Sequence, residues 1–135
     1  MDLATSMMIA ASGMRAQSDR MRTIAQNLAN ADSTASSAGG DPYRRQIPTM
    51  TSEFDNEVGA TMVKSGDPVP DQSDFRSKYD PGNPAADSKG YVKLPNVNPL
   101  IEIMDMREAQ RSYEADMNTL NAAKTMMSRT VDLLR

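Results

Sequence analysis

Residues 98–135 read NPLIEIMDMREAQRSYEADMNTLNAAKTMMSRTVDLLR, and this stretch decides the fold. Counting from Ile103 by alternating threes and fours reaches almost only apolar or aromatic side chains. This spacing places them along one line of a helix, as in coiled coils. Asn98 is suited to cap that helix and Pro99 to open its first turn. The line, here called the C-terminal seam, comprises Ile103, Met106, Tyr113, Met117, Leu120, Met127, Val131 and Leu134, with Gln110 and Lys124 as polar interruptions.

The opposite side of the same helix is built of small or uncharged residues, again spaced by threes and fours. A solvated helix back normally carries charged residues. This composition therefore predicts a second contact, made by close backbone approach. These positions, here called the second face, are Ser112, Ala115, Thr119, Ala122 and Met126.

A similar helix is predicted over residues 1–31. It has the same spacing, a single polar interruption at Gln17 and a back of small residues, and Gly13 weakens it by up to ~1 kcal/mol relative to alanine. We expect the two terminal helices to pair as an antiparallel coiled coil. The N-terminal seam comprises Leu3, Met7, Ala10, Met14, Met21, Ile24, Leu28 and Ala31.

The middle of the chain, residues 32–97, reads as a small, irregular β-rich region. It opens with a loop rich in Ser, Ala and Gly, and prolines and glycines accumulate in its second half. Extended segments are expected at Tyr43–Phe54, Val58–Val63 and Tyr91–Leu94. The sequence thus predicts a mainly α protein in three segments: helix 1–31, middle 32–97 and helix 98–135.

Composition restricts the function classes. The net charge of −3 argues against nucleic acid as a partner. With no His and no Cys, the usual zinc, nucleophile and general-base sites cannot be built, so we expect no enzyme activity, cofactor, metal or small-molecule substrate. No apolar run approaches the ~20 residues of a membrane span, and the start of the sequence lacks a cleaved-signal pattern.

The two seams exceed what a small monomer can cover. Ordering the backbone costs about 1–2 kcal/mol per residue, so one seam against one partner helix is marginal. The 39% share of apolar residues includes twelve methionines, most of them in the terminal segments, where they fit more than one neighbour. We therefore expect an assembly in which each helix is surrounded by others.

Several separated motifs resemble the flagellar rod, hook and hook-associated axial proteins. They are SGMRAQ at residues 12–17, IAQNLANADS at 24–33 and DMREAQRSYEAD at 105–116. Within that family, YDPGNP at 79–84, GYV at 90–92 and PNVN at 95–98 are similar to the proximal rod subunit. The resemblance covers nearly the whole chain, and its motifs come in the family's order.

The resemblance implies a structural subunit of the proximal rod, which crosses the periplasm and transmits torque from rotor to hook. Its implied partners are further copies of itself, other rod proteins, the membrane-ring complex at the rod base and the flagellar type III export apparatus, with no signal cleavage. An alternative class is a coiled-coil secretion chaperone or adaptor acting as a soluble binding module. Such a chaperone would stay in the cytosol, so detection in the envelope fraction separates the two hypotheses.

Overall fold

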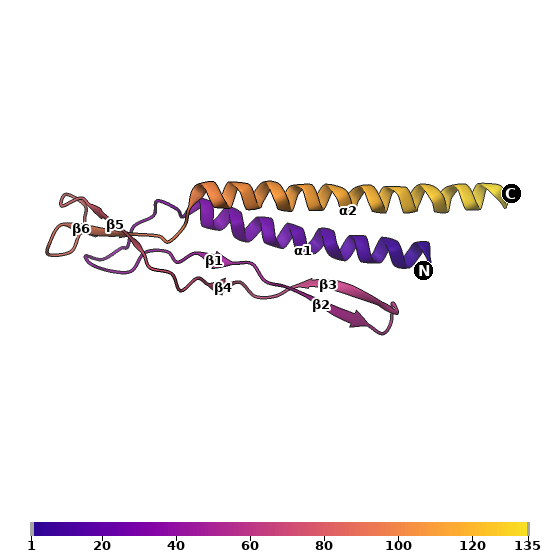
Figure 1. Cartoon of the computed structure of the whole chain (residues 1–135), viewed down its shortest axis with the longest axis horizontal. Helices are drawn as coiled ribbons and strands as arrows, with labels where there is room; N and C mark the ends of the chain where they lie inside the picture. The colour runs from indigo at the N-terminus through magenta and orange to yellow at the C-terminus, as the bar shows by residue number, and fades with distance from the viewer. Residues whose placement is uncertain (1, 135) are drawn as a thin grey trace. The chain divides into compact units, whose positions relative to one another are not determined.

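The computed structural model describes residues 2–134 and consists of two long terminal helices with short strands between them (Figure 1). Helix α1 spans Leu3–Ala29 and helix α2 spans Pro99–Leu133. The two helices run antiparallel and are in contact. The predicted mainly α fold, with paired end helices and a small β-rich middle, is confirmed.

The start of α2 is capped as its sequence predicts. The Asn98 side-chain oxygen accepts a hydrogen bond from the Leu100 N–H at 3.1 Å, and its carbonyl accepts one from the Glu102 N–H at 3.1 Å. This side chain satisfies one of the N–H groups that a helix leaves unpaired at its start. The helix bounds differ from the predicted ones by one or two residues at each end.

The strands form three separate two-stranded antiparallel sheets. Their pairs are β1 (Gln46–Ile47) with β4 (Val69–Pro70), β2 (Met50–Asp55) with β3 (Ala60–Ser65), and β5 (Arg76–Tyr79) with β6 (Tyr91–Leu94). The predicted Tyr91–Leu94 strand is confirmed with its bounds, whereas β4 and β5 were not predicted.

Two predicted strands were placed wrongly. The segment Tyr43–Phe54 divides into β1 and β2 around Pro48, which has no N–H for a ladder. The segment Val58–Val63 starts too early, because Val58 and Gly59 belong to the turn that joins β2 to β3. There the Asp55 carboxylate accepts the Val58 N–H at 3.2 Å, and Gly59 has a φ of 67° that side-chain-bearing residues avoid.

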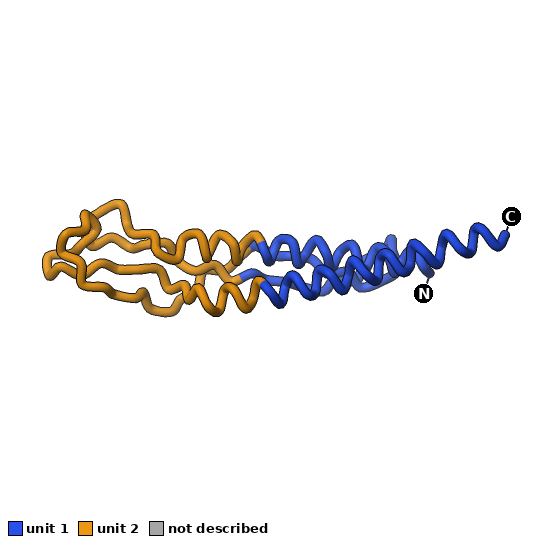
Figure 2. The backbone as a smooth tube through the Cα atoms, turned by 90° about the horizontal axis from the view of Figure 1, so that it is seen from above, with its two compact units in different colours: residues 1–21, 48–67, 107–135 blue, residues 22–47, 68–106 orange. Residues whose placement is uncertain are grey.

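Two compact units, coloured in Figure 2, each contain part of both helices. Unit 1 comprises residues 1–21, 48–67 and 107–135, and unit 2 comprises 22–47 and 68–106. In unit 1, the β2–β3 hairpin is fastened to α1: the Val63 N–H donates to Ser12 Oγ at 3.2 Å, and Ser65 Oγ donates to Asp19 Oδ2 at 2.6 Å. The predicted division into segments 1–31, 32–97 and 98–135 stays a prediction.

The core is thin and consists largely of alanine. Ile24, Val92 and Val97 are the large apolar side chains that are almost fully buried. The buried alanines are Ala10, Ala16, Ala31, Ala60, Ala85, Ala109 and Ala123. Within residues 2–134, no helix combines the length and the hydropathy that a membrane crossing requires.

Candidate assembly interface

The contact between α1 and α2 is made by small residues in unit 1. Ala109 and Ala123 of α2 are buried, as is Ala16 of α1. A Cβ atom added at Gly13 would collide with the Asp116 carboxylate of α2. Small side chains allow two helix axes to approach closely. At these positions, the backbones of α1 and α2 therefore come close together without large side chains interlocking between them.

The inward line of α2 differs from the predicted C-terminal seam by one residue in every heptad. Met106, Tyr113, Leu120 and Met127, four of the seam positions, are half-buried. The other half of the line is formed by residues that the sequence pattern missed, each directly before a predicted position: Glu102, Ala109, Asp116 and Ala123. Their seven-residue spacing could have revealed these four residues. A search for large apolar side chains passes over them, however, because two are small and two are acidic.

The remaining C-terminal seam residues are exposed in the described chain. Ile103 and Met117 are about two-fifths exposed. Val131 is 55% and Leu134 is 84% exposed, because α2 extends past the first residues of α1 (Figure 1). These four positions stay predictions for contacts with other subunits.

The N-terminal seam is covered more completely. Ala10, Ile24 and Ala31 are buried, and Leu28 is exposed. The rest of this seam is half-buried: Leu3, Met7, Met14 and Met21. Of the second face of α2, Ser112 is half-buried, and the other four positions are exposed: Ala115, Thr119, Ala122 and Met126. The second face therefore also stays a prediction.

A buried ion pair lies at the start of α2 in unit 2. The Glu102 side chain is 0% exposed, and its Oε1 accepts a hydrogen bond from Arg45 Nε at 2.6 Å. Arg45 also lies 3.4 Å from Asp71 Oδ2 and 3.7 Å from Asp105 Oδ2. Burial lowers the pKa of Arg45, but hydrogen bonds and charge from Glu102 and Asp71 outweigh burial and hold that pKa above its usual value.

Asn27 connects this ion pair to the end of α1. Its Nδ2 donates to Glu102 Oε2 at 3.2 Å and to the Gln46 carbonyl at 2.8 Å. Its Oδ1 accepts the Tyr43 O–H and the Gln46 N–H, both at 2.9 Å. Asn27 is fully buried, and all its hydrogen-bonding capacity is used. We call Asn27, Tyr43, Arg45, Asp71 and Glu102 the polar node.

The sequence reading did not find the polar node. Arg45 and Glu102 meet across 57 residues of sequence, a separation that no pattern within one helix spans. A buried charge persists in a protein only when it is paired, so the node is a structural fastening of α1, β1 and α2.

Comparison with known proteins identifies this architecture. Residues 7–35 match the family described as flagella basal body rod protein, and residues 88–133 match the flagellar basal body rod FlgEFG protein C-terminal family. The chain is 47% identical over 133 residues to the flagellar basal-body rod protein FlgC of Agrobacterium fabrum, covering 98% of this chain and 96% of the relative. The chain belongs to the FlgC family of flagellar basal-body rod proteins.

FlgC proteins of two other bacteria also match the chain over nearly its whole length. The FlgC protein of Aquifex aeolicus is 39% identical over 132 residues, covering 98% of this chain and 97% of the relative. That of Bacillus subtilis is 36% identical over 143 aligned positions, with 95% of each chain covered. The chain therefore spans nearly the full length of these FlgC proteins.

Membership of the FlgC family gives the function. The chain is a structural subunit of the flagellar basal-body rod, it assembles with other rod subunits, and its family is not enzymatic. The predicted rod role and the predicted location in the basal body are confirmed. Among the residues that the structure describes, no group of three or more His, Cys, Asp or Glu side chains could hold a metal ion.

One charged residue of the FlgC-family helix pair lies in an unfavourable place. Asp116 is half-buried beside Gly13, and burial raises the pKa of its carboxyl above the ordinary 3.8. On α1, the buried Oε1 of Gln17 has no hydrogen-bond partner within the described residues. The Asp116 carboxyl therefore weakens the helix contact in unit 1 of the isolated FlgC-family subunit.

The Asp116 carboxyl predicts a pH dependence. A carboxyl whose pKa is higher in the folded than in the unfolded chain contributes stability in acid, and this contribution is lost as pH rises from about 3.8 through the folded pKa. We expect Asp116→Asn to remove this loss, so that the variant is the more stable protein at neutral pH. Urea unfolding over a pH series, followed by circular dichroism, measures the difference. Glu114→Gln on the exposed surface is the matched control, and identical pH profiles for wild type and Asp116→Asn would contradict the assignment.

Proposed function

We propose that this rod subunit occupies the proximal part of the rod, crosses the periplasm and passes torque from the rotor towards the hook. Two features support the proximal position. The motifs at residues 79–84, 90–92 and 95–98 resemble the proximal subunit, and the middle between the helices is short. Matching FlgC relatives are covered over 96% and 97% of their length, so they too have a short middle.

The observation that carries the proposal is the exposed apolar surface of α2. Large apolar side chains are exposed near the start, at the middle and near the end of the helix: Leu100, Ile101, Ile103, Met104, Met117, Met126, Val131, Leu133 and Leu134. Contiguous exposed apolar surface marks a site of protein–protein contact. Because these residues lie on several sides of α2, we assign the exposed seam positions and the second face to contacts with different neighbours in the rod.

Torque transmission requires a subunit that resists shear. The polar node supplies this resistance to shear in unit 2, because charge-assisted hydrogen bonds from Arg45 and Asn27 converge on the buried Glu102. Sliding α2 along α1 by one residue would separate Glu102 from both donors. The node therefore fixes the register of the two helices where the alanine contacts alone would permit slippage.

The thin core supports export through the flagellar type III apparatus, the first partner that the subunit would meet. The chain has no cysteine, so no disulfide has to be opened. Its buried apolar residues are mostly alanines, which contribute little burial energy each. Such a subunit unfolds easily and gains most of its stability from its neighbours after export. At the rod base, we assign the membrane-ring complex as a further neighbour.

Fractionation and complementation test the proposed function. In a strain lacking the gene, a tagged wild-type chain should restore swimming and be found in purified basal bodies, at the membrane-proximal end of the rod by immunolabelling. A tagged chain that restores swimming yet stays wholly in the cytosol would instead establish the chaperone hypothesis. Labelling at the hook end of the rod would refute the proximal assignment while leaving the rod role intact.

A further inference from the structure

The tip of the β2–β3 hairpin is a rigid, acidic loop that carries an exposed aromatic ring. The Asp55 carboxylate accepts the Glu57 N–H at 2.9 Å and the Val58 N–H at 3.2 Å, which fixes the turn. Phe54 is one of only two phenylalanines in the chain, and it is 58% exposed. Exposed aromatic side chains on preformed turns are typical anchors of protein interfaces.

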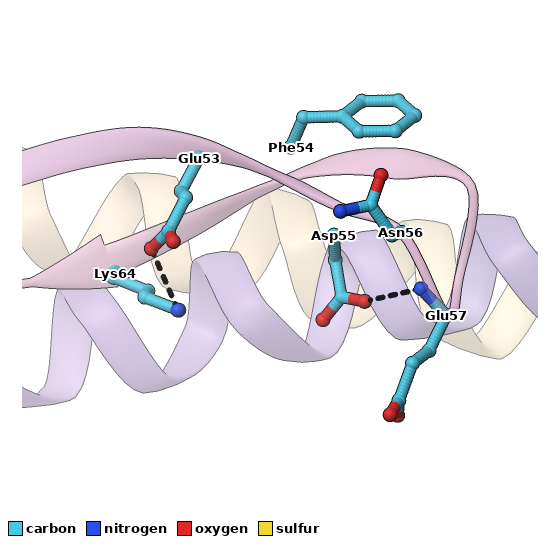
Figure 3. Close-up of a pocket in the computed structure, with 6 residues that line it drawn as sticks. All are labelled: Glu53, Phe54, Asp55, Asn56, Glu57 and Lys64. Atoms are coloured by element: carbon cyan, nitrogen blue, oxygen red, sulfur yellow. Dashed lines mark hydrogen bonds and ion pairs between the residues drawn. The ribbon is translucent and has the colours of Figure 1, made fainter.

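Figure 3 shows how the groups at this tip are distributed. The Phe54 ring stands on one side of the hairpin, and the Glu57 side chain points to the other side. Glu53 is paired with Lys64 at 2.6 Å, whereas the Glu57 carboxylate makes no ion pair within the described residues. The tip therefore presents an apolar ring and an unpaired carboxylate on opposite sides of a thin, fixed loop.

A surface with matching chemistry lies on the last third of α2. A shallow hollow of about 570 Å³ is lined by Asn121, Lys124, Thr125, Ser128 and Arg129. Lys124 and Arg129 are exposed and make no ion pair within residues 2–134, and the stretch 117–131 contains no acidic residue. Asp132 is the nearest carboxylate beyond it. Two exposed cations thus lie beside a shallow, open hollow along one face of α2.

The same chain already contains the contact that such docking requires. In unit 2, the Arg44 guanidinium lies 4.2 Å from the centre of the Phe75 ring, a favourable cation–π geometry. If Phe54 packed against Lys124 or Arg129, this cation–π contact would be repeated, and the other of the two cations would meet the Glu57 carboxylate. Aromatic and charge complementarity therefore point to the same surface.

The tip cannot reach the hollow of its own subunit. Within unit 1, the hairpin is fastened to α1 through Ser12 and Asp19, and α2 contacts α1 through Gly13 and Arg20. Helix α1 lies between the hairpin and α2 in Figure 1. Donor and acceptor surfaces on different sides of one subunit produce a heterologous contact, which repeats as an open array rather than a closed dimer.

We propose that the β2–β3 tip of one subunit docks into the Lys124–Arg129 hollow on α2 of a second copy, with Phe54 against one cation and Glu57 against the other. This inference rests on the proposed role in the rod, where subunits stand side by side. It names a contact between copies that includes one position on the line of the C-terminal seam, the polar interruption Lys124, and none of the second face.

Variants of the full-length protein that remove one side of the contact test it in solution, because they stop an array of subunits from growing. The donor variant is Phe54→Ala with Glu57→Gln, and the acceptor variant is Lys124→Gln with Arg129→Gln. Each alone should lose association of the wild type by about tenfold or more in sedimentation velocity. An equimolar mixture should form dimers and nothing larger, because only one intact donor and one intact acceptor then meet. The matched control, Arg107→Gln with Arg111→Gln, removes two exposed cations of α2 outside the hollow and should associate like wild type.

Cross-linking tests the contact in the assembled rod. The chain has no cysteine, so Glu57→Cys with Thr125→Cys should give disulfide-linked dimers and larger multimers in basal bodies. Glu57→Cys with Thr119→Cys, on another side of α2, should give neither. A wild type that stays monomeric in solution and yields no dimer from the first pair overturns the inference, as does a cross-link from position 57 to a different rod protein. These results leave the proposed function standing when the variants still enter the rod and cells swim, whereas absence of the wild-type chain from basal bodies refutes that function itself.

Discussion

Glu102→Ala is expected to lower the free energy of unfolding of unit 2 by about 3–5 kcal/mol, since removing one partner of a buried ion pair leaves the other charge uncompensated. Arg45 would keep only the longer contacts to Asp71 and Asp105, at 3.4 and 3.7 Å. Asn27 would lose one of its two acceptors. Hydrogen exchange resolved by residue is the measurement, and protection should fall in residues 22–47 and 91–106 first.

Burial, not distance, decides this effect, and the chain provides its own control. Lys64 and Glu53 form an ion pair of the same 2.6 Å length, but each side chain is 60% exposed. Exposed pairs are screened by water and contribute little, so Lys64→Ala should leave the unfolding curve almost unchanged. If Glu102→Ala proved as mild as Lys64→Ala, Glu102 would not be a fastening point.

Replacing both partners separates charge from packing. Glu102→Leu combined with Arg45→Met should recover much of the stability that Glu102→Ala loses, because apolar groups of similar volume often replace a buried pair without cost. The double variant should nevertheless allow the helices to slip. A disulfide between cysteines placed on facing positions of α1 and α2 would then form in more than one register.

Ala123→Asp is expected to abolish rod assembly and to lower monomer stability by several kcal/mol. Ala123 is 2% exposed, so an aspartate there would place an unpaired charge between the helices. Leu120→Asp, at a half-buried position one turn earlier, should act in the same way. Both proteins should be synthesised but leave cells non-motile.

The adjacent residue is the matched control for that change. Ala122 is exposed and belongs to the second face, so Ala122→Asp should leave monomer stability within about ±0.5 kcal/mol and still prevent swimming if neighbours cover this face. Thermal unfolding of the monomer and swimming in soft agar separate the two effects. Normal swimming of the Ala122→Asp strain would remove the second face from the assembly, and normal swimming of Ala123→Asp would contradict the observed helix contact.

The helices and half of their contact could be predicted from the sequence because they depend on local periodicity. Asn98, Pro99 and the spacing of Met106, Tyr113, Leu120 and Met127 are all readable within a few turns of one helix. The other half of the contact was missed because a seam chosen by hydropathy is placed on the large apolar residues, and the small residues next to them are passed over. Ala109 and Ala123 carry little apolar area, yet their size permits the close approach.

The polar node was not readable for a different reason. No periodic pattern links Asn27, Arg45 and Glu102, and each has an ordinary surface interpretation when considered alone. Only the folded chain brings them together. The β2–β3 turn was similarly missed: its bounds depend on the Asp55 carboxylate, which forms hydrogen bonds to backbone N–H groups that follow it.

The separation of the node's members along the chain imposes an order in time. A polypeptide emerges from the ribosome with its N-terminal part first, so Asn27 and Arg45 are available long before Glu102, which lies 75 and 57 residues further on. Until then the arginine lacks its buried counter-ion and α1 lacks the helix it packs against. Contacts between such distant residues form slowly, because a long loop must first be closed. The polar node therefore cannot form before residue 102 has emerged. Until then, a nascent or incompletely exported chain lacks this fastening and can pass through a narrow channel as an unfolded polypeptide.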